Sequence, residues 1–259
     1  PRSCAHDRLL VRREGQLLPW GCAVTDQRST IDAAGSGAAG PSREQRPVPA
    51  LMIAWSRHEP RRVGEVMLFE MEGAAQIFGR GEPAGAPAGR VVLRRLRPGE
   101  GAPSPPLASP AISREQLRIT PRRGKRDVVR SGRCATLHRG EKVDRCSLSP
   151  GDTLLLDGQM LLLCTTRPAS SPALRDFPAR MLRGFGEPDE LGLLGESPAM
   201  WRLRETLAFQ AKAGAHTLVL GPSGAGKELC ARAIHLLSSR RGGPFIARNA
   251  ATLPHGLVD

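Results

Sequence analysis

One stretch of the sequence has the residue types needed to hold a phosphate chain. A short apolar run at 217–220 is followed by a glycine-rich turn and then by apolar residues at helical spacing, which predicts a buried strand, a loop and a helix. Glycines let the backbone fold so that successive N–H groups point inward, and the following helix adds partial positive charge. The lysine would neutralise the β- and γ-phosphates. The turn consists of Gly221, Pro222, Ser223, Gly224, Ala225, Gly226 and Lys227.

The residue after the lysine departs from the general phosphate-loop pattern. That pattern has Ser or Thr, whose hydroxyl reaches magnesium, where this chain has Glu228. The loop with this Glu forms a colinear series with the segments at 194–200, 231–235 and 243–249. The series closely resembles the AAA+ ATPase domain of bacterial sigma-54-dependent transcription activators, a family that carries Glu at this position. The resemblance runs from Leu191 to Asp259.

The resemblance implies a nucleotide site and an activity of a larger protein. ATP would be held by the loop and Glu228, and Leu193 and Leu194 would contact the base. The family also uses Mg²⁺, which its Walker B acidic pair holds. In the family, a ring homo-oligomer couples ATP hydrolysis to remodelling of sigma-54 RNA polymerase, and a C-terminal domain binds DNA. The family's Walker B acidic pair, sensors and arginine finger lie further along the domain. We therefore expect 191–259 to be a truncated α/β P-loop (AAA+) domain without catalytic residues, which binds nucleotide weakly and does not turn it over.

The region 47–167 has the pattern typical of an all-β sandwich. Short apolar segments are separated by Gly, Pro and charged residues, and no long helical pattern interrupts them. The predicted strands are 51–55, 65–69, 76–78, 91–96, 116–119, 127–129, 136–137, 153–156 and 160–164. The Pro-, Ser- and Gly-rich stretch 98–110 is expected to be an exposed loop.

Three short motifs in this region look like those of forkhead-associated (FHA) domains. They are Gly-Arg at 79–80, Ile-Ser-Arg at 112–114 and Ser-Pro-Gly-Asp at 149–152. In that family the matching arginine and serine bind the phosphate of a phosphothreonine peptide. The resemblance assigns these roles to Arg80 and Ser113, with Arg114 as a helper. The chemistry is suitable, because a phosphate dianion favours a guanidinium fork and a hydroxyl donor.

Two positions differ from the FHA pattern. The family has a structural His where this chain has Gln116, and its Asn-Gly-Thr loop aligns best with Cys-Ala-Thr at 134–136. A second interpretation therefore stays open, in which Arg80 is a solvated surface charge and the sandwich contacts a partner protein or its own ATPase.

The remaining segments are expected to connect or flank these two regions. Residues 1–46 show little periodicity and include a Gly- and Ala-rich run at 33–41, which predicts a disordered or poorly ordered leader. Residues 168–190 contain four prolines and are expected to be an interdomain linker, in which Phe177, Met181, Leu182 and Phe185 could form one short helical turn against a neighbour. An amphipathic helix is predicted at 199–212.

Composition limits the other possibilities. Hydrophobic residues make up 40% of the chain but aromatic ones only 3%, so the cores should consist of Leu, Val, Ile and Ala. No apolar run approaches the roughly 18 residues of a membrane span, and no secretory signal opens the chain, which predicts a cytoplasmic protein with no membrane partner. The net charge of +13 comes from scattered arginines without interleaved aromatic residues, which favours compositional bias over a nucleic-acid surface. The six cysteines form no C-x-x-C pair, so no metal site is expected.

Two classes of function follow. In the first, the chain is a sigma-54-dependent transcriptional regulator, in which an ATP-binding domain is coupled to an FHA-like sensory or partner-binding domain. In the second, it is an FHA-type signalling module that binds a phosphopeptide or another partner, and the ATPase is a non-functional remnant.

Overall fold

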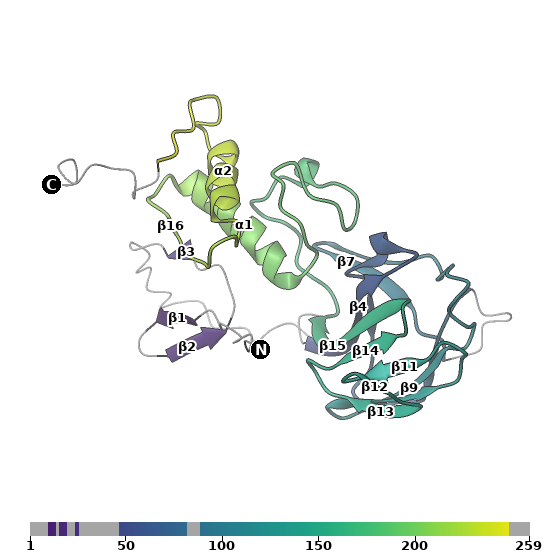
Figure 1. Ribbon diagram of the computed structural model, residues 1–259. Coiled ribbons are helices and arrows are strands. Elements are labelled where there is room, and N and C mark those ends of the chain that lie inside the picture. The colour runs from purple at the N-terminus through teal and green to yellow at the C-terminus, as the bar shows by residue number, and fades with distance from the viewer. Residues whose placement is uncertain (1–9, 14–15, 20–23, 26–46, 82–88, 249–259) are drawn as a thin grey trace, which may run out of the picture.

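The structure is a computed structural model that describes residues 10–13, 16–19, 24–25, 47–81 and 89–248. Two units stand side by side in Figure 1: a β-sandwich, and a helical unit that contains the predicted phosphate-binding loop. Within the described part of the chain, no helix is both long enough and apolar enough to span a bilayer.

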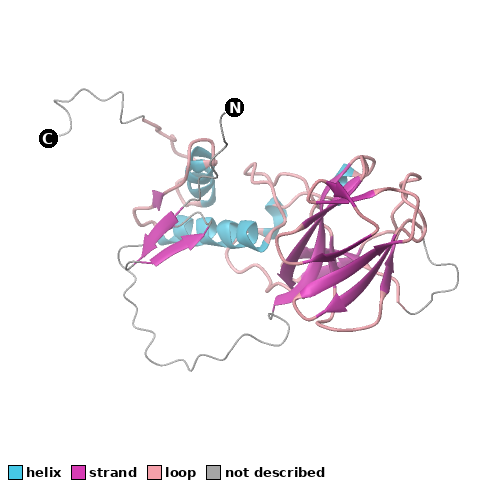
Figure 2. Ribbon diagram, turned by 60° about the horizontal axis from the view of Figure 1, so that its bottom comes forward, coloured by secondary structure: helices cyan, strands magenta, loops and turns pink. Residues whose placement is uncertain are grey.

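The β-sandwich consists of two antiparallel sheets that face each other (Figure 2). The smaller sheet has the order β13-β10-β9-β6, and the larger has the order β12-β11-β14-β15-β4-β5-β7-β8. The strands are β4 (Pro47–Ser56), β5 (Val66–Leu68), β6 (Gln76–Phe78), β7 (Leu93–Arg97), β8 (Glu100–Pro103), β9 (Leu117–Arg122), β10 (Lys125–Arg130), β11 (Thr136–His138), β12 (Glu141–Lys142), β13 (Arg145–Leu148), β14 (Thr153–Leu156) and β15 (Met160–Pro168). A 3₁₀ turn, η2 (Pro60–Arg62), follows β4.

The sandwich core is aliphatic, as the composition predicts. In β9, Leu117 and Ile119 are fully buried, whereas Arg118 between them is exposed, so the strand alternates between core and solvent. The hairpin of β14 and β15 contributes further buried leucines and Met160 from the opposite sheet. The antiparallel all-β fold expected for 47–167 is confirmed.

In the described part of the sandwich all nine predicted strands are present, together with three that the sequence did not predict. Part of the stretch 98–110, which was predicted to be a loop, forms strand β8 and pairs with β7. All four residues of β8 are exposed. Because an edge strand needs only backbone pairing, no apolar alternation signals it in the sequence. The short strands β12 and β13 escaped prediction for a similar reason, since only one residue of the two, Leu148, is buried.

The helical unit is built from two packed helices, α1 (Pro198–Ala213) and α2 (Lys227–Leu237). The hydroxyl of Ser197 caps α1 by accepting a hydrogen bond from the amide of Met200 at 3.2 Å, and Gly214 ends the helix in the left-handed conformation at φ 64°. The helix predicted at 199–212 is therefore confirmed. Leu207 and Ala208 of α1 pack with Cys230 and Ala233 of α2 in one buried cluster.

The strand before the loop is less buried than expected. Strand β16 (Leu218–Val219) pairs with β3 (Val24–Thr25), and the side chain of Leu218 is 57% exposed. A two-stranded ladder offers no wider sheet for helices to cover on both faces, so the apolar run at 217–220 is not enclosed as the sequence predicts.

The two segments outside the predicted domains contain structure of their own. Within 1–46, strands β1 (Leu10–Arg13) and β2 (Gln16–Pro19) form an antiparallel hairpin, and the rest of the predicted disordered leader, apart from β3, lies outside the described residues. Within 168–190, the expected short turn is present as η3 (Ala179–Met181). Phe177 is buried against α1, where the carboxylate of Glu205 accepts hydrogen bonds from backbone amides, including that of Phe177 at 3.0 Å. This part of the predicted linker is therefore folded against the helical unit.

A buried ion pair fixes the chain that leads into α1. Nε of Arg204 donates to Oδ2 of Asp189 at 2.8 Å, and its Nη atoms donate to the carbonyls of Leu193 and Gly195 at 2.7 and 2.8 Å. Oδ1 of Asp189 accepts from the amides of Leu191 and Leu193, both at 2.9 Å. Both charged side chains are almost fully buried, so every donor and acceptor in this group needs its partner.

Replacing Arg204 should therefore destabilise the helical unit. Arg204→Ala leaves the Asp189 carboxylate buried without a counter-charge, and we expect the free energy of unfolding to fall by about 3–5 kcal/mol. The control is Arg202→Ala on the exposed face of α1, which should change stability by no more than about 0.5 kcal/mol. Urea unfolding followed by circular dichroism measures both variants, and equal losses in the two would contradict the role given to the pair.

Candidate functional site

The predicted phosphate-binding loop forms a tight turn directly before α2. Gly224 and Gly226 have φ angles of 76° and 82°, in the left-handed region that favours glycine, and the helix begins at Lys227. A Cβ on Gly221 would lie 3.4 Å from Cβ of Ala225, an ordinary van der Waals contact across the loop. The loop is therefore a turn between β16 and α2, as the sequence predicts, and not part of a continuous helix.

The lysine side chain curls back across this loop. Nζ of Lys227 donates to the carbonyl oxygens of Gly221 at 2.9 Å and Pro222 at 2.7 Å. An ammonium has three donors, so these contacts use two of them. The amides of the first turn of α2 have no acceptors within their own helix, and the helix dipole places partial positive charge at the same end. Backbone and side chain together make this end of the helix suitable for an anion.

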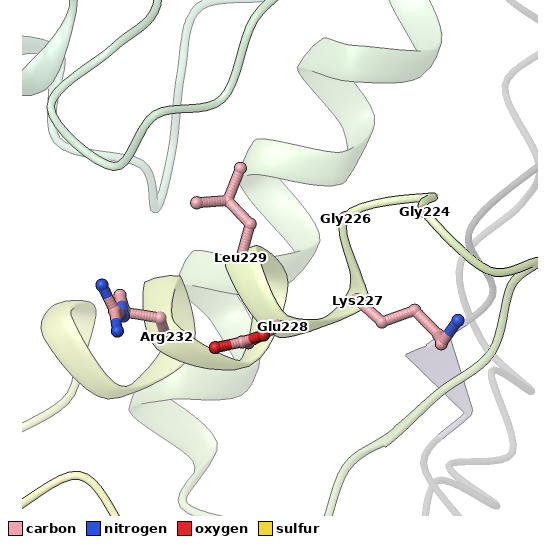
Figure 3. A pocket seen from close by; sticks show the side chains of 6 residues that line it. All are labelled: Gly224, Gly226, Lys227, Glu228, Leu229 and Arg232. Carbon is pink, nitrogen blue, oxygen red and sulfur yellow. The ribbon is translucent and has the colours of Figure 1, made fainter. Parts of the chain in front are cut away.

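A pocket of about 530 Å³ opens beside the loop. It is lined by Gly224, Gly226, Lys227, Glu228, Leu229 and Arg232. Figure 3 shows Glu228 and Arg232 on the helix, with Lys227 extending away from them on the other side of the loop. Two cations and one carboxylate give the lining a net positive charge. Arg232 was not among the predicted site residues, although its position four residues after Glu228 places both on one face of the helix.

The two leucines predicted to contact the base are placed differently. Leu193 is only 3% exposed and packs with Leu207 and Ala233 in the core of the helical unit, so its side chain is not available to a ligand. Leu194, in contrast, is 57% exposed. The prediction that Leu193 contacts the base is therefore wrong, because this apolar side chain packs into the core beside the two helices. Leu194 remains a candidate for the base contact.

The three residues predicted to bind phosphate on the sandwich come together at one end of it. The amide of Arg80 donates to the carbonyl of Ser113 at 3.0 Å, and its Nε donates to the carbonyl of Ile112 at 3.1 Å. A Cβ on Gly79 would lie 2.1 Å from the carbonyl oxygen of Arg114, a distance that no real contact reaches. The 79–80 motif therefore needs its glycine so that the 112–114 motif can pass directly over it.

Gln116 joins the loops around this end of the sandwich. The residue is fully buried; its Oε1 accepts hydrogen bonds from the amides of Ser113 and Cys134, both at 3.3 Å, and its Nε2 donates to the carbonyl of Cys134 at 2.8 Å. Oγ of Ser113 accepts from the amide of Arg133 at 3.0 Å, which leaves the hydroxyl proton available to another acceptor. Gln116 thus makes the structural contacts at the position where the FHA pattern has His.

Three arginines and one thiol lie at this second site. Arg114 and Arg133 are exposed, and Arg80 is half-buried, so the three can contribute positive charge at one end of the sandwich. Cys134 forms no disulfide, and burial raises the pKa of its thiol, which keeps it neutral. The described residues contain no cluster of three or more His, Cys, Asp or Glu side chains that could hold a metal ion.

Comparisons with known proteins match the part of the chain that contains the phosphate-binding loop. Residues 193–259 match the family model of the Sigma-54 interaction domain, which confirms the resemblance in this part of the chain. The C4-dicarboxylate transport transcriptional regulatory protein DctD of Pseudomonas aeruginosa is 54% identical over 67 residues, which cover 26% of this chain and 14% of that protein. The DNA-binding transcriptional regulator NtrC of a Bradyrhizobium species is 43% identical over 74 residues, which cover 29% and 15%.

Solved structures similar to the chain include FHA domains. The FHA domain of an Arabidopsis thaliana hypothetical protein is 18% identical with a TM-score of 0.34, and the match covers 54% of this chain and all of that one. The chain spans about a seventh of the length of the curated regulators named above.

The close approach at Gly79 gives a direct test of the second site. In Gly79→Ala, the 112–114 backbone must move away from Arg80, and we expect a loss of about 1–3 kcal/mol in unfolding free energy from the forced contact. Gly73→Ala is the control, because a Cβ there would meet only the carboxylate of Glu70 at 3.6 Å. Thermal unfolding compares the two variants, and a Gly79 variant as stable as the Gly73 variant would show that the motifs do not pack as described.

Proposed function

We propose that this chain belongs to a sigma-54-dependent transcriptional regulator, in which a nucleotide-binding AAA+ domain is coupled to an FHA-like sensory or partner-binding domain. The observation that carries the proposal is the match of 193–259 to the Sigma-54 interaction domain, over a loop whose two left-handed glycines and terminal lysine suit a nucleotide's phosphates. A transcriptional role is also what the names of the similar regulators state for those proteins.

The cations and amides beside the loop suit the phosphates of ATP, and the carboxylate beside it suits Mg²⁺. The first-turn amides of α2 and the ammonium of Lys227 would bind the β- and γ-phosphates, and Arg232 would add positive charge from the pocket wall. Glu228 places a carboxylate on the same wall, and carboxylate oxygens are ligands that Mg²⁺ accepts together with phosphates and water. When bound, Mg²⁺ would neutralise charge on the phosphates. The exposed side chain of Leu194 would contact the base.

The activity of the larger protein follows from the proposed family. ATP hydrolysis by a ring homo-oligomer would remodel sigma-54 RNA polymerase, DNA would be bound through a separate C-terminal domain, and the protein would act in the cytoplasm, without a membrane partner. The residues of 191–248 named above supply phosphate and base contacts, and we assign no catalytic step to them.

The sandwich would bind a phosphothreonine in a partner protein. Arg80 is held by its Nε, so its two Nη atoms would form the guanidinium fork, Ser113 would donate its hydroxyl proton, and Arg114 would assist. What supports this proposal is that the fold brings these residues together from two separate loops around a fully buried Gln116. The second function class is a signalling module that binds a phosphopeptide or another partner through the sandwich. It differs from the first in having an ATPase remnant that does not function.

Loss of the loop lysine should weaken nucleotide binding. In a titration with a fluorescent ATP analogue, we expect Lys227→Ala to raise the dissociation constant by about tenfold or more, because a charge-assisted hydrogen bond to phosphate is lost. Lys212→Ala is the matched control, since that lysine lies on α1 and pairs with Asp176. Identical binding by both variants, or no binding by the unmodified chain at millimolar nucleotide, would favour the signalling module over the ATP-binding regulator.

Phosphopeptide binding can be tested on the same chain. We expect a phosphothreonine peptide library to retain peptides on the unmodified chain, and Arg80→Ala to lower the affinity of a selected peptide by about tenfold or more. Arg118→Ala, which removes an exposed charge from the outer face of β9, should bind as the unmodified chain does. If no phosphopeptide is retained, or if both variants bind equally, the sandwich does not recognise phosphothreonine through Arg80.

A further inference from the structure

An arginine of the sandwich reaches into the helical unit. Arg97, the last residue of β7, donates from Nη2 to Oε1 of Glu196 at 2.5 Å, and from Nε to both carboxylate oxygens at 3.2 Å. The side chains are only 17% and 6% exposed. In Figure 1 the chain that precedes α1 runs between the sandwich and the helices, so this contact crosses between the two units.

The remaining donors of Arg97 are also used by the helical unit. Its Nη1 donates to the carbonyl of Arg183 at 2.8 Å, and its Nη2 donates to that of Gly184 at 2.9 Å. The amide of Gly186 donates to the same Glu196 oxygen at 3.0 Å. One guanidinium from the sandwich thus organises two separate stretches of the chain before α1, around 183–186 and at Glu196.

A second arginine of the sandwich holds the backbone at the same place. Nη2 of Arg167, near the end of β15, donates to the carbonyl of Glu196 at 2.9 Å, and both residues are buried. The two sandwich arginines therefore fix both the side chain and the main chain of Glu196. A surface salt bridge would hold neither, because exposed charges remain mobile and screened by solvent.

The segment fixed in this way touches the helix that follows the phosphate-binding loop. Three residues before Glu196, Leu193 packs with Cys230 and Ala233 of α2. A Cβ on Gly192 would lie 3.3 Å from Cδ1 of Leu229, and Leu229 lines the pocket beside the loop. A continuous set of contacts therefore runs from Arg97 through 192–196 to the first turn of α2.

We propose that Arg97 is a positioning residue for the nucleotide pocket: by holding Glu196, the sandwich fixes segment 191–197 against α2 and so controls the shape of the pocket beside the phosphate-binding loop. This inference rests on the proposed function, because it makes the sandwich a regulator of the site assigned to ATP. It gives the sandwich a mechanical route to that site, which starts from Arg97 and Glu196, two residues outside both candidate sites.

The proposal can be tested on the whole chain without nucleotide. Amide hydrogen exchange, measured by mass spectrometry, should become faster by about tenfold or more in 191–197 and in the first turn of α2 when Arg97 is replaced by Ala. Strand β4 is the internal reference, because its exchange reports the stability of the sandwich itself. Arg94→Ala is the matched control: Arg94 lies on the same strand, but its Nη1 donates to Gly101 within the sandwich.

Nucleotide titration provides the second measurement. Arg97→Ala should weaken binding of a fluorescent ATP analogue, and Arg94→Ala should not. Arg97→Lys keeps the charge but loses the two-point contact with Glu196. If Arg97→Ala fails to fold, the same exchange and titration measurements are made on Arg97→Lys, with the same expected direction of change. The proposal is overturned if exchange in 191–197 and the first turn of α2 is unchanged in the Arg97 variants, or rises equally in Arg94→Ala. Absence of nucleotide binding in the unmodified chain would instead refute the ATP site, and the exchange comparison would still decide whether Arg97 positions the segment.

Discussion

Buried guanidinium groups hold the chain between Asp189 and Glu196, and the arrangement of both units depends on them. Arg204 binds this chain from α1, while Arg97 and Arg167 bind it from the sandwich. Removing charges from water is costly, and the cost is offset only when each donor meets an acceptor at good geometry. Arg97 and Arg204 meet that condition through carboxylates and backbone carbonyls together. Arg167 donates to one backbone carbonyl, and its buried Nε has no hydrogen-bond partner among the described residues. A segment with no regular secondary structure is thereby kept in one conformation.

Both candidate sites depend on glycine, but for different physical reasons. On the sandwich, Gly79 lets the 112–114 loop pass over the 79–80 motif, which brings a guanidinium and a hydroxyl together. Before α2, Gly224 and Gly226 adopt left-handed conformations, which turn the chain into the helix. In both places the backbone is shaped first, and the charged side chain is then anchored to a carbonyl, Arg80 to Ile112 and Lys227 to Gly221 and Pro222. Each charged group is thus held against the backbone of neighbouring loops.

The sequence predicted the strands and turns that are determined by the residues within a few positions of each other. Strands with one buried face, such as β14, were found with their observed bounds, and so was the turn before α2. The exposed edge strand β8 carries no alternation, so nothing in the sequence distinguished it from a loop. The prediction that Leu193 contacts the nucleotide base was wrong because the side chain is buried. That burial depends on how α1 and α2 pack, which the local sequence does not show. The contact of Arg97 with Glu196 joins residues 99 positions apart, and no pattern in a single sequence relates them.

Several arginines of this chain are buried and stabilise its interior, which the net charge alone does not reveal. Arg62, Arg126, Arg167 and Arg204 are buried, and they donate to carbonyls of the chain, to buried carboxylates, or to both. Several guanidinium groups also lie over aromatic rings: Arg204 is 4.5 Å and Arg97 is 5.9 Å from the ring centre of Trp201. A planar cation with five donors can satisfy buried carbonyls in irregular segments, which Leu, Val or Ile cannot do. In a protein with few aromatic residues and long non-repetitive connections, arginine therefore takes part in packing the interior. A charge of +13 is for that reason no measure of a nucleic-acid surface here, because some of the cations that produce it are buried and already bound to the protein.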